Sequence, residues 1–190
     1  LNVTRPPLNH VRVRRALALA IDRELLVAQV TRGGQAPAYH FIPATEKFTS
    51  QARLRGDLTE ARRLLAAAGY PEGRGFPKIE LLYNTSENHR VIAEAIQQMW
   101  HRHLGVEIGL RNEEWKVYLD SVTQMDFQIA RRGWIGDYVD ANNFLDLYLT
   151  DGGNNNTGFS DPRYDEMILK LAPQAKTREE RYRIFYEAET

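Results

Sequence analysis

The sequence contains no cysteine among its 190 residues. That absence excludes disulfide bonds and every metal site built on thiolate ligands, and it suits an exported protein. No apolar run approaches the roughly 20 residues that a membrane-spanning helix requires, so we expect no integral membrane segment. Excess charge of either sign is missing as well, because 25 basic and 25 acidic residues cancel. Nucleic-acid and membrane-surface partners call for a basic face, so neither is expected.

The chain nevertheless has the apolar material for a folded core, since 43% of its residues are hydrophobic. No internal repeat, low-complexity tract or interdomain linker is visible, and we therefore predict a single α/β domain over residues 1–190. The chain begins at Leu1 without an initiator methionine and stops inside a predicted helix. We interpret it as an excised fragment of a larger protein, so a missing signal peptide says nothing about its compartment.

The middle of the chain has a β-α-β-α-β pattern. Strand-like alternation occurs at residues 78–83, at 106–111 and again from Phe127. Between them lie a long amphipathic helix that ends before Gly105 and a shorter one that we expect Asn112 to cap. Connections of this length allow right-handed crossovers, so the three strands are predicted to form a parallel sheet flanked by helices.

The flanking regions are predicted to be mostly helical. We expect Asn9, Asp22 and Asp57 to cap three helices before the sheet. Residues 35–56 carry prolines and scattered polar residues without periodicity, which predicts a long surface loop. Beyond the sheet, a short helix near Phe144 is followed by a Gly- and Asn-rich loop and by two further helices.

The third predicted strand leads into the most informative stretch of the sequence. It breaks at Gly133, and the turn that follows carries the indole of Trp134 and the carboxylate of Asp137. Ligands of open α/β sheets sit beyond the carboxyl ends of the strands, so this turn is the predicted site. The alternative is structural: Trp134 fills a core and Asp137 stabilises the turn by binding nearby backbone amides.

Signals for catalysis or for a metal are weak, and we predict no catalytic residue, no metal site and no cofactor. His101 and His103 are two positions apart on a helix, so they cannot face one metal ion together. His89 stands alone near the amino end of a helix, and Ser86 lacks the context of a nucleophile elbow. A hydrolase that uses His89 and a nearby carboxylate remains the alternative from another class.

A binding site fits the strand ends better. Asn84, Arg111 with Asn112, and Arg131 end or follow the three strands, on what is predicted to be one edge of the sheet. Together with Asp137 they suit a small zwitterionic ligand, with the carboxylate for an ammonium and the cations for a carboxylate.

Three stretches resemble the oligopeptide-binding proteins of bacterial ABC importers, which are solute-binding proteins of family 5. The resemblance is carried by residues 11–23 (VRVRRALALAIDR), 82–86 (LYNTS) and 130–138 (ARRGWIGDY), the last followed by Asn142, Phe144 and Leu145. It covers nearly the whole chain and implies a lobe of the type II periplasmic-binding-protein kind, taken from the large lobe of a two-lobe receptor. It also implies a periplasmic location, an oligopeptide ligand, permease subunits as partners and no enzymatic activity; we expect a monomer.

The resemblance also assigns roles to individual residues. Asp137 is implied to hold the α-ammonium of the peptide, and Gly133 and Trp134 to border the ligand; Ile135, which follows Trp134, is assigned to the same set. Arg131 and His89 are implied to meet the peptide carboxylate at different ligand lengths.

One departure concerns the preferred peptide length. A basic residue that the family has shortly before the third strand is replaced by Val122 here. A murein peptide, a dipeptide, haem or a nickel chelate remains an alternative cargo within the same family. An unpaired Asp137 facing a ligand without an amine would be costly, which argues against the last two.

Overall fold

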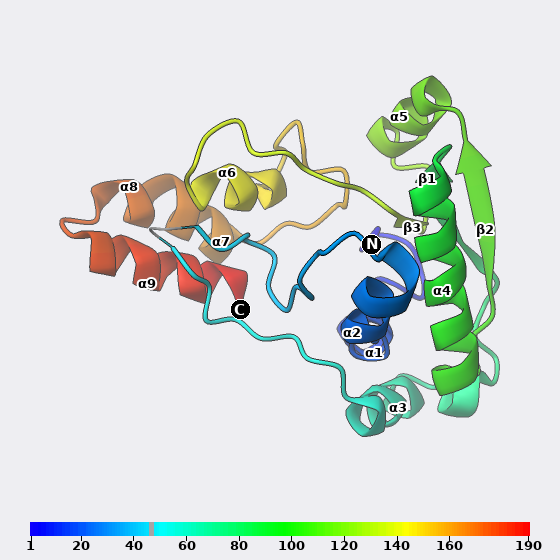
Figure 1. Cartoon of the computed structure of the whole chain (residues 1–190). Helices are drawn as coiled ribbons and strands as arrows, with labels where there is room; N and C mark the ends of the chain where they lie inside the picture. The colour runs from blue at the N-terminus through cyan, green and yellow to red at the C-terminus, as the bar shows by residue number, and fades with distance from the viewer. Residues whose placement is uncertain (46–47) are drawn as a thin grey trace. The chain divides into compact units, whose positions relative to one another are not determined.

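The computed structural model describes residues 1–45 and 48–190 (Figure 1). Contacts between residues group the chain into two compact units. Unit 1 comprises Leu1–Pro37 and Arg55–Arg132, and unit 2 comprises Ala38–Leu54 and Gly133–Thr190. The single lobe expected over residues 1–190 stays a prediction.

Unit 1 contains the predicted parallel sheet. Strand β1 (Ile79–Asn84) lies in the middle and pairs in parallel with β2 (Ile108–Glu113) and with β3 (Ile129–Ala130), in the order β2-β1-β3. Helix α4 (Glu87–Leu104) connects β1 to β2, and α5 (Trp115–Thr123) connects β2 to β3. The β-α-β-α-β prediction is therefore confirmed, although β3 is shorter than its pattern indicated.

Both faces of this sheet are covered. Leu81 and Leu82 are consecutive in β1, so their side chains point to opposite faces, and both are buried. Leu82 packs in a cluster with Tyr118 and Val122 of α5 and with Phe127. Burial on both faces is the usual condition of a parallel sheet, because crossover helices lie over it. It also places Val122 inside α5 rather than in a turn.

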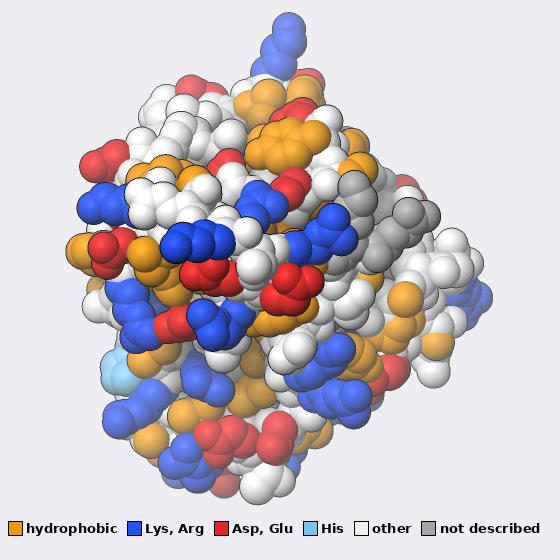
Figure 2. All heavy atoms as spheres, turned by 90° about the vertical axis from the view of Figure 1, so that its left-hand side faces the viewer, with side chains coloured by type: hydrophobic (Ala, Val, Ile, Leu, Met, Phe, Trp, Pro, Cys, Tyr) orange, Lys and Arg blue, Asp and Glu red, His pale blue; other side chains and the backbone are white. Residues whose placement is uncertain are grey.

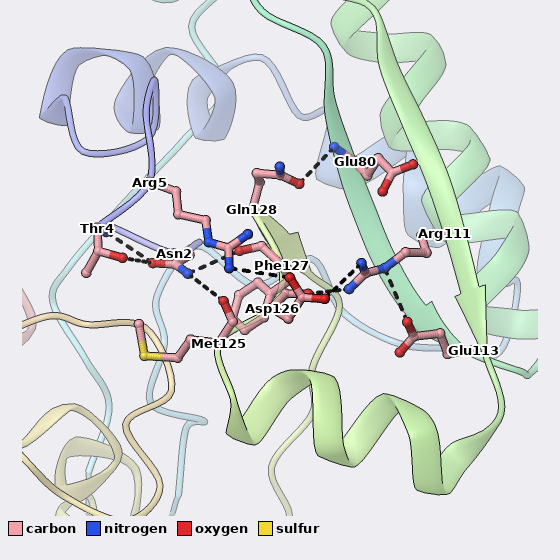
Figure 3. Close-up of polar contacts among 10 residues, drawn as sticks. All are labelled: Asn2, Thr4, Arg5, Glu80, Arg111, Glu113, Met125, Asp126, Phe127 and Gln128. Atoms are coloured by element: carbon pink, nitrogen blue, oxygen red, sulfur yellow. Dashed lines mark hydrogen bonds and ion pairs between the residues drawn. The ribbon is translucent and has the colours of Figure 1, made fainter.

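The amino-terminal segment lies along the free edge of β3. Asn2 is fully buried, and its amide nitrogen donates to the backbone oxygens of Met125 and Phe127, each at 3.1 Å (Figure 3). Its backbone N–H donates to the oxygen of Gln128 at 2.9 Å, and its side-chain oxygen accepts from Thr4. One buried amide thus fixes the loop that leads into β3.

The remaining helical elements of unit 1 are α1 (Val11–Leu19), α2 (Arg23–Leu25), the π-helical turn η1 (Leu26–Thr31), α3 (Leu58–Ala67) and the 3-10 turn η2 (Pro71–Gly73). Helix α1 packs on α3, and α4 contacts both α3 and η1. The side chains of Asp22 and Asp57 cap α2 and α3 as predicted. Trp100 of α4 donates its indole N–H to the oxygen of Leu17 in α1, at 2.8 Å.

Two predicted caps are wrong. Helix α1 is capped by His10, whose Nδ1 accepts from the N–H of Arg12, and not by Asn9. Helix α5 is capped by Glu114, since Asn112 still belongs to β2. Both errors have one cause: the helix begins one or two residues later than the first residue with a good capping side chain.

Unit 2 is helical and has its own core. Its helical elements are α6 (Asn142–Leu145), the 3-10 turn η3 (Asp146–Tyr148), α7 (Pro162–Glu166), the π-helical turn η4 (Met167–Leu171), α8 (Ala172–Gln174) and α9 (Arg178–Glu189). Phe185 of α9 and Tyr164 of α7 are buried in this core.

Residues 38–54 are more than the surface loop that their composition predicted. Ile42 and Phe48 are buried in the core of unit 2, although no helix or strand is found among the described residues of this segment. Phe48 stacks on the ring of Tyr186, with centroids 5.1 Å apart. The carboxylate of Glu189 accepts from the N–H groups of Phe41 and Ile42, which ties the segment to α9.

Candidate functional site

The carboxyl ends of the three strands meet at one edge of unit 1. Asn84 ends β1 and is paired with Glu113, the last residue of β2. Beyond β3, the N–H of Arg131 continues the ladder by donating to the oxygen of Leu82 at 2.8 Å. The edge predicted to hold the site therefore exists, and it presents side chains from β1 and from the segment after β3.

His89 and Arg131 lie together at this edge. His89 is half-buried in the first turn of α4, and its Nδ1 is 2.8 Å from the side-chain oxygen of Asn84. Burial lowers the pKa of the imidazole, the charge of Arg131 lowers it further, and the bond to Asn84 opposes both. Two side chains predicted to meet the same carboxylate are thus electrostatically coupled in the structure.

The backbone of Arg131 is held by α5. The hydroxyl of Tyr118 donates to the backbone oxygen of Arg131 at 2.7 Å. Burial raises the pKa of Tyr118, so the phenol stays a donor over the whole physiological range. Burial also lowers the pKa of the half-buried Arg131 guanidinium, and no carboxylate is among the groups that shift this pKa.

The predicted contribution of Arg111 to this edge is not found. Its guanidinium donates to the backbone oxygen of Asp126, lies 3.5 Å from that carboxylate, and is 3.3 Å from Glu113 (Figure 3). Asn112 accepts a hydrogen bond from the hydroxyl of Thr85. Arg111 therefore fixes the loop before β3, and of the two arginines predicted for this edge only Arg131 remains a candidate.

In unit 2, Trp134 is half-buried and its ring is fixed by a hydrogen bond. The indole N–H donates to the side-chain oxygen of Asn143 in α6 at 2.7 Å. Gly136 lies against the ring of Phe144, where an added Cβ would be 3.3 Å from the nearest ring carbon. The turn thus rests on α6 at two points.

Asp137 is exposed, and among the described residues its carboxylate makes no hydrogen bond or ion pair within unit 2. The structural alternative, in which Asp137 stabilises the turn through backbone amides, therefore has no hydrogen bond to support it. Its neighbours are exposed and apolar: Ile135 is 92% exposed and Val139 78%. The turn therefore presents an exposed carboxylate among exposed apolar side chains.

The support beneath this turn was not predicted. Asp140, which precedes α6, accepts the N–H of Asn142 at 2.9 Å and two hydrogen bonds from Arg181 of α9. Asn143 is 4% exposed, an unusual burial for an amide. No periodicity links these positions, since Arg181 lies in a different helix far along the chain. The burial of Asn143 and its contact with Trp134 can therefore be recognised only in the structure.

The catalytic alternative finds little support in the geometry. The Nδ1 of His89 is bonded to an amide oxygen, whereas a general base of the His–carboxylate kind needs an acidic partner there. Among residues 1–45 and 48–190, no group of three or more His, Cys, Asp or Glu side chains could hold a metal ion. No helix in the same ranges is both long and apolar enough to span a bilayer.

Charges of both signs are intermixed on the surface. Figure 2 shows one face of the molecule, where Lys and Arg side chains lie among Asp and Glu side chains. Neither sign forms a continuous field there, which agrees with the balanced composition.

Comparisons with known proteins show to which family the chain is similar. The family model described as bacterial extracellular solute-binding proteins, family 5 middle, matches residues 1–156. The oligopeptide-binding protein OppA of Bacillus subtilis is 38% identical over 176 residues, which is 88% of this chain and 32% of that protein. The periplasmic murein peptide-binding protein MppA of Escherichia coli is 39% identical over 183 residues, covering 91% of this chain and 33% of that protein.

A solved structure has the same fold. The periplasmic oligopeptide-binding protein OppAIV of Borrelia burgdorferi superimposes with a TM-score of 0.92 and 37% sequence identity, over 100% of this chain and 38% of that chain. The chain thus spans about a third of the length of the curated relatives that it matches.

Proposed function

The chain belongs to family 5 of the bacterial extracellular solute-binding proteins, and we propose that it is part of a receptor that captures oligopeptides for an ABC importer. It forms one lobe segment of a larger two-lobe protein in the periplasm, acts as a monomer and delivers its ligand to the permease subunits. The similarity to proteins named for oligopeptide and murein peptide binding supports this cargo, since it extends over most of the chain.

The observation that carries the proposal is the free carboxylate of Asp137. It is the anchor for the α-ammonium of the peptide, because a charge-assisted hydrogen bond contributes about 1.5–3 kcal/mol and identifies a free amino terminus. Ile135 and Trp134 then provide apolar surface for the first side chains, and Gly133 leaves room for the peptide main chain close to the turn.

Within unit 1, Arg131 and His89 are the residues proposed to meet the peptide carboxylate. The guanidinium of Arg131 is half-buried, and no carboxylate is among the groups that shift its pKa. Its charge acts on His89. A peptide carboxylate supplies the negative charge that both side chains lack. Contacts to main chain and termini, with loosely packed side chains, allow many peptide sequences to bind.

Asp137 disfavours cargo without an amine. Haem or a nickel chelate would leave Asp137 desolvated and unpaired, which is energetically costly. A murein peptide or a dipeptide presents a suitable ammonium, and the similarity to a murein peptide-binding protein keeps that cargo as the second candidate.

Calorimetric titration of di- to pentapeptides into the full-length protein tests the proposal. We expect N-acetylation of the peptide and the change Asp137→Asn each to weaken binding by about tenfold to a hundredfold, without adding together. Glu166→Gln is the matched control, because it removes an exposed carboxylate elsewhere in unit 2. Binding that is insensitive to acetylation would exclude Asp137 as the ammonium anchor.

The enzymatic alternative is tested with the same peptides. Peptide turnover that disappears in His89→Ala would replace the receptor by a hydrolase. We expect the peptides to be recovered intact after prolonged incubation with the full-length protein.

A further inference from the structure

Asn143 stands out because its side chain is buried while the elements around it are short. Its exposed fraction is 4%, and it lies in α6, a helix of four residues. Burying an amide without hydrogen bonds is unfavourable by a few kcal/mol, so the buried side chain of Asn143 needs a hydrogen-bond partner. The partner of its side-chain oxygen is the indole N–H of Trp134.

This hydrogen bond has the features of an orienting contact. The indole is a donor only, and it has a single N–H, so one acceptor defines the direction in which that edge of the ring points. The distance of 2.7 Å is short for an N–H···O bond. The ring face remains partly accessible, because Trp134 is half-buried.

Helix α6 is itself anchored at both ends. At its start, Asp140 accepts two hydrogen bonds from Arg181, at 2.7 and 2.9 Å, and it also accepts the N–H of Asn142. At its end, the buried hydroxyl of Tyr164 donates to the oxygen of Leu145 at 2.6 Å. A helix of one turn has little stability of its own, so these contacts from α7 and α9 hold it in place.

From this arrangement we propose that Asn143 is a positioning residue for Trp134: it sets the orientation of the indole that borders the ligand. The effect of Asn143 on peptide affinity rests on the proposed function, whereas its effect on the orientation of the Trp134 ring does not. Asn143 itself does not touch the ligand. It acts through Trp134, and α6 transmits the rigidity of the helical core of unit 2 to the binding turn.

The ring is tested first in the full-length protein without peptide, by 15N labelling of tryptophan. Trp134→Phe identifies the Trp134 signal among those of the other tryptophans. In the unchanged protein we expect the indole N–H of Trp134 to exchange slowly with solvent, because a buried acceptor holds it. Rapid exchange, at the rate of a free indole, would overturn the proposal without any variant.

Variants of Asn143 extend the test. Asn143→Leu should shift the Trp134 signal and speed its exchange, whereas Asn143→Asp keeps an acceptor oxygen and should retain slow exchange. Asn9→Leu is the control, since it makes the same change at an exposed position. A Trp134 signal that is unchanged in Asn143→Leu contradicts the proposal.

Peptide titrations then test whether the orientation matters for binding. Asn143→Leu should weaken affinity about threefold to tenfold, and the loss should vanish when Trp134 is already Phe. A loss that persists in the Trp134→Phe background would mean that Asn143 acts independently of the indole. If the unchanged protein binds no peptide, the proposed function fails while the exchange measurements still decide the role of Asn143.

Discussion

The guanidinium of Arg181 donates two hydrogen bonds to the carboxylate of Asp140, at 2.7 and 2.9 Å. The same guanidinium lies over the ring of Phe185, 4.6 Å from its centroid. One side chain of α9 therefore joins the helical core of unit 2 to the residue that precedes α6. This pair connects the helical core of unit 2 with the segment that follows the turn carrying Asp137.

Breaking this pair should destabilise unit 2. Asp140→Ala is expected to lower the free energy of unfolding by about 1–2 kcal/mol, since the pair is bidentate but about a third exposed. Urea unfolding of Asp140→Ala, Arg181→Ala and the double variant measures the coupling. Strict additivity of the two single changes would show that the hydrogen bonds contribute nothing.

The buried amide of Asn2 should matter more than its place near the chain end indicates. Asn2→Leu removes the donor for two backbone oxygens, and we expect a loss of about 2–3 kcal/mol in the free energy of unfolding. Asn9→Leu, at an exposed position nearby in sequence, is expected to change stability by less than about 0.5 kcal/mol. Thermal unfolding of both variants makes the comparison, and equal effects would contradict the role of Asn2.

Two close glycines provide a third prediction. A Cβ at Gly73 would lie 2.2 Å from the backbone oxygen of Gly105, and Gly73 has φ +74°. Gly73→Ala should therefore destabilise by more than about 2 kcal/mol, since backbone rather than a mobile side chain is in the way. Gly69→Ala is the matched control: its φ is +97° and nothing lies within 4 Å of the added Cβ. If both changes have the same effect in urea unfolding, backbone strain alone explains it.

Acidification should weaken the fold through His89. The pKa of His89 lies below its usual value of 6.5 in the folded protein, so the unfolded chain binds the proton more tightly. Its contribution to stability is complete above about pH 6.5 and is lost as the pH falls from there through the folded-state pKa. Unfolding curves of the unchanged protein and of His89→Gln at several pH values test this. Parallel pH profiles would contradict it.

Peptide binding should reverse the shift at His89. A peptide carboxylate placed beside the imidazole favours its charged form, so binding near pH 6 should take up protons. Calorimetry in buffers of different ionisation enthalpy measures that uptake. We expect it to fall in His89→Gln, whereas a peptide amide should show no uptake even with the unchanged protein.

The sheet was predictable because its signal is local and periodic. Short apolar stretches of strand length marked β1 and β2, and the continuous apolar stripe of α4 between them indicated a crossover connection. Strand β3 was predicted too long, because the residues after Ala130 find only one further ladder bond, from Arg131 to Leu82. Alternation in the sequence cannot show how many partners a strand will have.

The misses in the site depend on contacts between distant residues. Arg111 was predicted to be a cation that faces the ligand, but its guanidinium forms ion pairs with Asp126 and Glu113. Asn143 and Arg181 carried no recognisable motif, because a single hydrogen bond between distant segments leaves no period in the sequence. The residues of the turn were proposed because their types indicate their chemistry directly, and their role stays a prediction.

The composition of unit 2 has a consequence for how the chain acquires its structure. Its first segment, residues 38–54, is synthesised well before its second, residues 133–190, and Phe48 and Ile42 are buried only in the joint core. Both side chains therefore stay uncovered while unit 1 is made. Residues 55–132, which separate the two segments in the chain, belong to unit 1. Once unit 1 has folded, these residues are no longer a long flexible loop, so joining the two segments costs less conformational entropy. Unit 1 is thus expected to fold before unit 2.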